Sequence, residues 1–202
     1  MAFNISNFRS DGLKYGGARP SLFDIILTAP TQLQSGPTLA KQLSLAAQSS
    51  QLPAANVDEI EIPYMGRKIK VLGDRTFSDW TATIQNDEDF ALRSMFEAWS
   101  NSMNAFISNR NLFGKSALDY KVDAVVRQYG KAGPNNESGV IRSYKMIGLW
   151  PKNISAINLD WAQTNTIETF DVTFALDWFE PEKFGDGQAY SVDQDENVTQ
   201  TN

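Results

Sequence analysis

The sequence has no cysteine and no histidine among its 202 residues. Without cysteine the chain forms no disulfide and supplies no thiol nucleophile, a composition that fits a reducing compartment. Without histidine it lacks the usual transition-metal ligand and the side chain that normally titrates near neutral pH. Ser-His-Asp and Cys-His sites therefore cannot be built from this chain alone. A carboxylate pair or a Ser/Lys dyad stays open, but we predict that the protein is not an enzyme.

The chain also lacks a long apolar run. No segment approaches the roughly 20 apolar residues that span a bilayer. The opening residues Met1–Ser6 contain neither the basic nor the apolar region of a signal peptide. We therefore expect the protein to stay in the cytoplasm in which it is made. At 42% hydrophobic residues, this length predicts one packed core.

Positive charge is scarce, with 18 Lys and Arg against 24 Asp and Glu, for a net charge of −6. Proteins that grip nucleic acid need clustered cations, so this balance argues against a DNA-binding surface. A local excess of cations occurs at Arg67, Lys68, Lys70 and Arg75. It predicts either a solvated hairpin face or a docking surface for an acidic neighbour.

Alternation of apolar and polar residues predicts about eight strands. They fall at residues 22–28, 57–72 (a hairpin that turns at Met65-Gly66), 77–84, 120–128, 140–149, 156–161 and 167–178, with a short one near 43–47 inside a loop over 30–50. Two apolar faces stand out: Trp80, Ala82 and Ile84, and then Phe170, Val172, Phe174, Leu176 and Trp178. The face opposite the second of these carries Asp171, Thr173 and Asp177, and in the hairpin Glu59 and Glu61 alternate with Ile60 and Ile62.

One helix is predicted from an apolar stripe at spacings of three and four: Leu92, Met95, Phe96, Trp99 and Met103. Asn86 is the expected cap, with Asp87, Glu88 and Asp89 at the positive end of the helix dipole. The fold class is therefore mainly β (α+β): a β-sandwich or partly closed barrel with one flanking helix. We divide the chain into an N-terminal arm at 1–19, a domain at 20–180 and an acidic C-terminal tail at 181–202.

Motifs that would hold a cofactor or metal are incomplete. Gly114-Lys115-Ser116 resembles the end of a phosphate-binding loop, but Asn109 replaces the first glycine that the loop requires. Residues 193–197 open like a calcium loop, but Val198 stands where a glycine must turn. We assign no catalytic residue, no cofactor and no metal.

Several blocks, in order, resemble the tail tube proteins of contractile-tailed bacteriophages. They are Arg19-Pro20 with Leu22-Phe23, Ile62–Phe77, Asp79-Trp80, Asn86–Glu88, Val126–Tyr129, Gly148–Pro151, Leu159–Trp161, and Thr169–Phe170 continued by Ala175–Asp177. Together they cover roughly residues 18–180. The resemblance implies a β-sandwich subunit of the virion tail, similar in fold to the tube protein of type VI secretion systems.

The resemblance also implies hexameric rings that stack into a tube. The partners would be other copies of the chain, a sheath outside, baseplate and tail-terminator proteins at the ends, and a tape-measure protein and then DNA in the lumen. We expect the hairpin to contact a neighbouring subunit or ring, because its cations cluster in an acidic protein. The stacking residues would be Tyr64, Met65, Gly66, Arg67, Lys68, Lys70, Asp74 and Arg75.

Three regions depart from the family pattern: residues 30–42 and 104–115 are longer than it needs, and the segment after Pro181 is additional. Two other functions stay open. One is a baseplate-proximal initiator of the tube. The other is a carbohydrate-binding β-sandwich that stacks sugars on Trp80, Trp99, Trp150, Trp161 or Trp178.

Overall fold

The computed structural model describes residues 5, 17–28, 30, 33, 36–114, 116, 119–131, 139–183, 190–192 and 198–200. The chain forms two compact units. The larger unit comprises Asp24–Val126 and Tyr144–Glu182, and the smaller unit comprises Met1–Phe23, Arg127–Ser143 and Lys183–Asn202. None of the helices in these residues is long and apolar enough to cross a membrane. The divisions at 1–19, 20–180 and 181–202 stay predictions, and most of the predicted arm lies outside the described residues.

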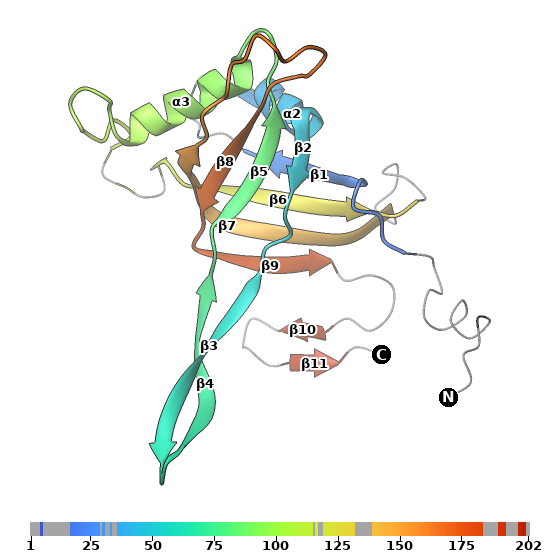
Figure 1. Cartoon of the computed structure of the whole chain (residues 1–202), viewed down its shortest axis with the longest axis vertical. Helices are drawn as coiled ribbons and strands as arrows, with labels where there is room; N and C mark the ends of the chain where they lie inside the picture. Colours follow the sequence, from blue (N-terminus) through green and yellow to red (C-terminus); the bar gives the residue numbers. More distant parts are fainter. Residues whose placement is uncertain are drawn as a thin grey trace. The chain divides into compact units, whose positions relative to one another are not determined.

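A seven-stranded sheet organises the fold (Figure 1). Its order is β1-β6-β7-β8-β5-β2, and β9 pairs with β7 off this path. The strands are β1 (Phe23–Leu27), β2 (Ala47–Ser50), β5 (Trp80–Gln85), β6 (Val122–Tyr129), β7 (Val140–Ile154), β8 (Thr169–Ala175) and β9 (Trp178–Lys183). The sheet does not close into a barrel in the described part of the chain. The predicted mainly β fold is confirmed.

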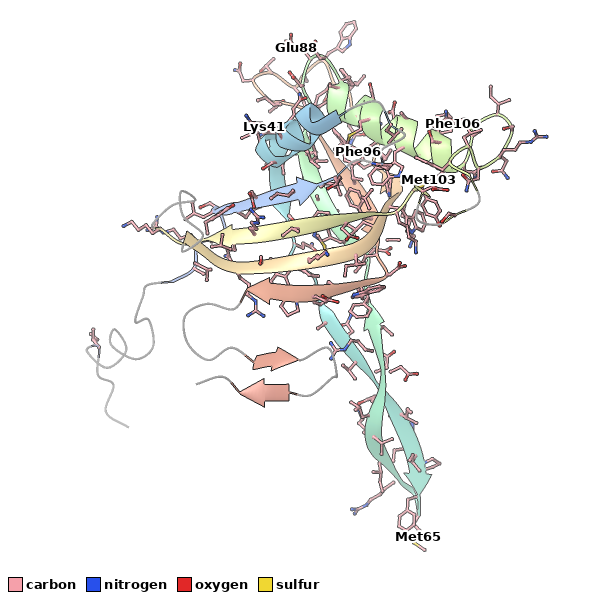
Figure 2. The ribbon with its side chains drawn as sticks, turned by 180° about the vertical axis from the view of Figure 1, so that it is seen from behind. Lys41, Met65, Glu88, Phe96, Met103 and Phe106 are labelled. Carbon is pink, nitrogen blue, oxygen red and sulfur yellow. The ribbon has the colours of Figure 1, made fainter. Side chains whose placement is uncertain are left out.

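The core lies where β5 and β8 face the helix α3 (Ala91–Met103). Antiparallel register places Trp80 opposite Phe174 and Ile84 opposite Phe170. All four side chains are buried, as the alternation predicts. Phe96 of α3 lies against this face, with its ring centroid 5.8 Å from that of Phe174 (Figure 2). The opposite face of the same strands is polar, since Thr83 Oγ1 donates to Asp171 Oδ1 at 2.7 Å.

The predicted stripe of α3 is confirmed for Leu92, Met95, Phe96 and Trp99, which are buried, whereas Met103 is half-buried. The predicted cap is wrong. Phe90 precedes the helix in a left-handed conformation with no side-chain cap, and the first turn of this fully described helix contains no acidic residue. Asn86 instead donates from Nδ2 to Glu168 Oε2 at 3.1 Å, because it continues the hydrogen bonding of β5. The acidic triplet forms a turn in which Phe90 N donates to Asp87 O.

A second helix, α2, spans Gly36–Ala46 and passes directly into β2. The predicted loop over 30–50 with a strand at 43–47 is therefore wrong in this part. Leu43 is buried while Leu45 is largely exposed, which a one-sided helix explains. Pro37, the second residue of α2, suits a first helical turn because its missing N–H would have no partner there.

Two strand predictions near the C-terminus are also corrected. Residues 156–161 form no strand, and Leu159 and Trp161 are exposed. The strand predicted at 167–178 ends at Ala175, and the chain bends at Asp177, whose N–H donates to Ile147 O at 3.0 Å. Trp178 then begins β9 and is 42% exposed, so it does not continue the buried face. Asp177 likewise does not share a strand face with Asp171.

The smaller unit is tied by backbone contacts of its own. Tyr129 N donates to Leu22 O at 2.8 Å, and Gly130 N donates to Gly139 O at 2.8 Å. The short strands β10 (Tyr190–Val192) and β11 (Val198–Gln200) pair antiparallel within the segment predicted as a tail. Most of the predicted loop at 130–139 and the calcium-like stretch at 193–197 lie outside the described residues.

Candidate assembly interface

Strands β3 (Ala55–Tyr64) and β4 (Arg67–Phe77) form the predicted hairpin. Figure 1 shows a long twisted ribbon that continues from β2 and β5 and projects beyond the sheet of the larger unit. Tyr64 pairs with Arg67, so Met65 and Gly66 make a two-residue turn. Their φ angles are 45° and 81°, and positive φ at both central residues is what a type I′ hairpin turn requires. The predicted turn is confirmed.

A β-bulge lies near the base of the hairpin, where the register shifts between Val57 and Glu59. Gly73 lies opposite this point. A Cβ at Gly73 would lie 2.6 Å from Asp58 O, closer than atoms can approach. Glycine therefore allows the two backbones to meet, and the bulge gives the ribbon extra twist.

One face of the hairpin is apolar and exposed. Ile60 pairs with Val71, and Ile62 pairs with Ile69, so the four side chains share a face. Their exposed fractions are 53%, 39%, 48% and 52%. We call Ile60, Ile62, Ile69 and Val71 the apolar face. β-Branched residues explain why this segment forms strands, but such a face is normally buried against another surface.

The other face carries ion pairs that cross the ribbon. Lys68 pairs with Glu61, and Lys70 pairs with Glu59. Over the whole hairpin, Arg67, Lys68, Lys70 and Arg75 are matched by Asp58, Glu59, Glu61 and Asp74. The cluster predicted as a local excess of positive charge is thus balanced inside the hairpin, because residues distant in the sequence become cross-strand neighbours.

The predicted stacking residues all lie on this exposed hairpin. Tyr64, Met65, Gly66 and Arg67 form its tip, which we call the hairpin tip; Lys68 follows it, Lys70 lies on the ion-paired face, and Asp74 and Arg75 lie near the bulge. Met65 is 89% exposed and lies at the far end of the ribbon (Figure 2).

The sequence analysis missed a second exposed apolar feature, the loop that follows α3. Phe106, Ile107 and Leu112 are exposed by 75%, 102% and 61%. Backbone hydrogen bonds hold the loop, including Leu112 N to Ser102 O at 2.8 Å. A signal was available, because residues 104–115 are longer than the family pattern needs.

Other candidate sites do not assemble. In the part of the chain that the structure describes, no group of three acidic residues could hold a metal ion. Lys115, in the triplet that resembles a phosphate-binding loop, lies outside the described residues. Trp80 and Trp99 are buried and donate their indole N–H to Gln51 O and Tyr120 O, so they offer no ring to a sugar.

Solved structures share this fold. A chain in the cryo-EM structure of the anti-feeding prophage baseplate aligns with a TM-score of 0.56 at 8% identity, over 82% of this chain and 95% of that one. A chain in the sheath–tube complex of an extracellular contractile injection system, PVC, in its extended state aligns with a TM-score of 0.50 at 14% identity, over 90% and 99%. At such identities the likeness establishes the fold alone, a fold found in contractile injection machines.

The sequence is more specific. The family described as "Phage tail tube protein" matches residues 18–180. Over 163 residues the chain is 39% identical to the tail tube protein gp19 of Enterobacteria phage T4, covering 81% of this chain and 91% of that relative. The chain therefore belongs to the phage tail tube protein family. It is a structural subunit of a tail tube and a component of the virion, which confirms the prediction from resemblance, and membership of a structural family implies a non-enzymatic role.

Proposed function

We propose that copies of this chain close into hexameric rings and that the β3–β4 hairpin joins each ring to the next. The exposed apolar face carries the proposal. A tube needs two different surfaces of each subunit to meet repeatedly, a head-to-tail arrangement that continues indefinitely. The projecting hairpin, with its exposed apolar face, supplies one of these two surfaces. Tyr64, Met65, Gly66, Arg67, Lys68, Lys70, Asp74 and Arg75 would lie in or beside this contact.

The energy available from the apolar face is sufficient. Full burial of an Ile or Val side chain contributes roughly 1.5–3 kcal/mol. Each of the four side chains is about half exposed, so covering the face would contribute on the order of 3–6 kcal/mol per hairpin. Each ring would add several such contacts, so a modest gain per subunit would stabilise a long tube.

The remaining partners follow from the tube itself. A sheath would surround it, baseplate and terminator proteins would occupy its ends, and a tape-measure protein and then DNA would occupy the lumen. The likeness to chains from a sheath–tube complex and a baseplate supports the sheath and the baseplate proteins of this set. Residues 20–180 would form the tube domain, with 1–19 as an arm and 181–202 as an acidic tail.

We further propose that the lumen is net negative and holds DNA without specific binding. The polar face of β5 and β8, with Asp171, is one surface that could line it. The net charge of −6 and the balanced charges of the hairpin support this proposal, since neither leaves a basic groove. Repulsion of phosphates would let DNA pass with few attractive contacts.

Paired substitutions on the two hairpin faces test the stacking proposal. Ile60→Thr with Ile69→Thr keeps β-branched side chains but makes two of the four side chains of the apolar face polar. We expect tubes to disappear from electron micrographs while unfolding of the unassembled subunit changes by less than about 1 kcal/mol. The matched control is Leu72→Thr, because Leu72 is 82% exposed but lies opposite Glu59, on the ion-paired face. Normal tubes from the double variant would refute the stacking role.

A further inference from the structure

A cleft of about 440 Å³ lies between α3 and the end of β7 in the larger unit. Phe106, Pro151 and Ile154 supply its apolar lining, and Arg93, Glu97 and Lys152 supply charged groups. This volume is in the range of roughly 300–1,000 Å³ that is usual for binding clefts. It is large enough to receive whole side chains.

The charged groups of the cleft are already paired within the chain. Arg93 Nε lies 2.8 Å from Glu97 Oε1, and Arg93 Nη1 donates to Ser155 O at 3.2 Å. Lys152 Nζ lies 2.7 Å from Asp79 Oδ2. A charged ligand would have to compete with these pairs, so the cleft favours an uncharged group over an ion, and Ser100 and Asn153 add uncharged polar atoms to its lining.

Phe106 is held at the mouth of the cleft by its loop. Its N–H donates to Asn101 Oδ1 at 3.0 Å, and Ala105 N donates to Arg110 O at 2.9 Å. The ring nevertheless remains 75% exposed. A hydrogen-bonded loop that holds a large aromatic ring in solvent presents a contact surface at little further cost in entropy.

The cleft and the hairpin tip lie far apart in the larger unit. Figure 2 shows Met65 at the end of the hairpin and Phe106 beyond the sheet on the α3 side, and Figure 1 shows α3 and the tip at opposite ends of this unit. Two surfaces at opposite ends of one unit can meet when copies are placed head to tail. They cannot meet within one copy in this conformation.

We infer that the α3–β7 cleft receives the hairpin tip of a second copy of this chain, with Met65 against Phe106. The inference rests on the proposed function, in which the hairpin joins copies. Methionine fills irregular clefts and its sulfur makes favourable contacts with aromatic rings. Tyr64, 62% exposed, adds an aromatic ring beside Met65. Met65 and Tyr64 carry no charge, so they suit a cleft whose own charged groups are paired within the chain.

Cysteine crosslinking tests the contact directly, because the chain has no cysteine of its own. Met65→Cys and Phe106→Cys are combined in one chain, and assembled tubes are oxidised and run on a non-reducing gel. We expect a ladder of covalent multimers that either single variant fails to give. The control combines Met65→Cys with Trp161→Cys, since Trp161 is fully exposed on the same unit but does not line the cleft.

The outcomes distinguish a failure of the cleft contact from a failure of the proposed stacking by the hairpin. A ladder from the control pair and none from the cleft pair would overturn the cleft as receptor while leaving the hairpin as a stacking element. If neither pair gives a ladder while Ile60→Thr with Ile69→Thr abolishes tubes, the cleft as receptor is also overturned. If that apolar-face variant still builds tubes, the stacking function itself fails.

A second measurement covers the case in which the cysteine pair does not assemble. The lowest protein concentration that gives tubes is measured for Met65→Ala, Phe106→Ala and the double variant. Each single change should raise it about tenfold. If the side chains touch, the double variant should also raise it about tenfold, because the second change removes nothing further. Independent effects, giving about a hundredfold rise, would overturn the contact.

Discussion

The packing of Phe174 gives a quantitative test of the fold. Phe174 is 1% exposed, and its ring lies 5.2 Å from that of Trp80 and 5.8 Å from that of Phe96. Phe174→Ala would leave a cavity between β5, β8 and α3, because the sheet and helix backbones hold the neighbouring rings apart. A buried Phe→Ala change costs roughly 3–5 kcal/mol, and the two ring contacts place this one toward the upper half.

Trp178→Ala is the contrasting change. The sequence pattern put Trp178 on the same apolar face as Phe174, but the structure exposes it, and its indole N–H donates to Glu180 Oε1 at 3.0 Å. Removal of a half-exposed ring and one solvent-accessible hydrogen bond should cost only about 1 kcal/mol.

Denaturant unfolding followed by tryptophan fluorescence measures both losses. It should be done on unassembled protein, in the Ile60→Thr with Ile69→Thr background, because assembly would add its own stabilisation. Phe174→Ala should lower the free energy of unfolding by at least about 2 kcal/mol more than Trp178→Ala does. Equal losses would refute the strand break at Asp177, and a nearly neutral Phe174→Ala would refute the packing of Phe174 in the core.

Three further predictions follow from local geometry and charge. Gly148→Ala should destabilise the subunit by about 1–3 kcal/mol in the same unfolding assay, because Gly148 has φ 71° and a Cβ there would lie 2.2 Å from Asp177 Oδ2; an unchanged midpoint would contradict it. Arg67→Glu with Lys68→Glu should slow tube growth, most strongly at low salt, where charges are least screened. Lys68→Glu with Glu61→Lys reverses the cross-strand ion pair without breaking it, so tubes of this variant should grow at close to the normal rate. Equal growth rates for these two variants and the unsubstituted protein would exclude electrostatics at this contact. The electrostatic potential mapped on an assembled ring should be negative along the lumen. A lumen lined mainly by Lys and Arg would overturn the proposal that DNA passes with few attractive contacts.

The sequence predicted the strands whose alternation is undisturbed. In β5 and β8 every second residue is apolar and lies on the buried face, so Trp80, Ile84, Phe170 and Phe174 were placed in the core correctly. The hairpin was predictable for the same reason, with Met65-Gly66 as a turn signal. Local pattern was sufficient there because each strand has one buried or one consistently apolar face.

The errors arose where tertiary contacts decide local structure. α2 begins with Gly36-Pro37, a pair that is typical of a loop or turn. The alternation through Leu176 and Trp178 continues in the sequence, but the hydrogen bond from Asp177 to Ile147 redirects the chain. At α3, Phe90 adopts a left-handed conformation that sequence propensity does not favour.

The sequence predicted the hairpin that we propose as the interface, but it did not predict which chemical groups the hairpin exposes. Clustered cations suggested an electrostatic contact, whereas the cross-strand pairs Lys68–Glu61 and Lys70–Glu59 leave apolar side chains as the unsatisfied surface. The cleft beside Phe106 combines α3 with the end of β7, two segments about fifty residues apart in sequence. Their juxtaposition depends on the packing of the helix on the sheet, which no local pattern reveals.

Electron cryomicroscopy of the purified, assembled protein tests the central proposal most directly. The account predicts stacked hexameric rings in which Ile60, Ile62, Ile69 and Val71 of each hairpin are buried against a subunit of the adjacent ring. A tube in which these four side chains remain solvent-exposed, with rings joined through other surfaces, would contradict it.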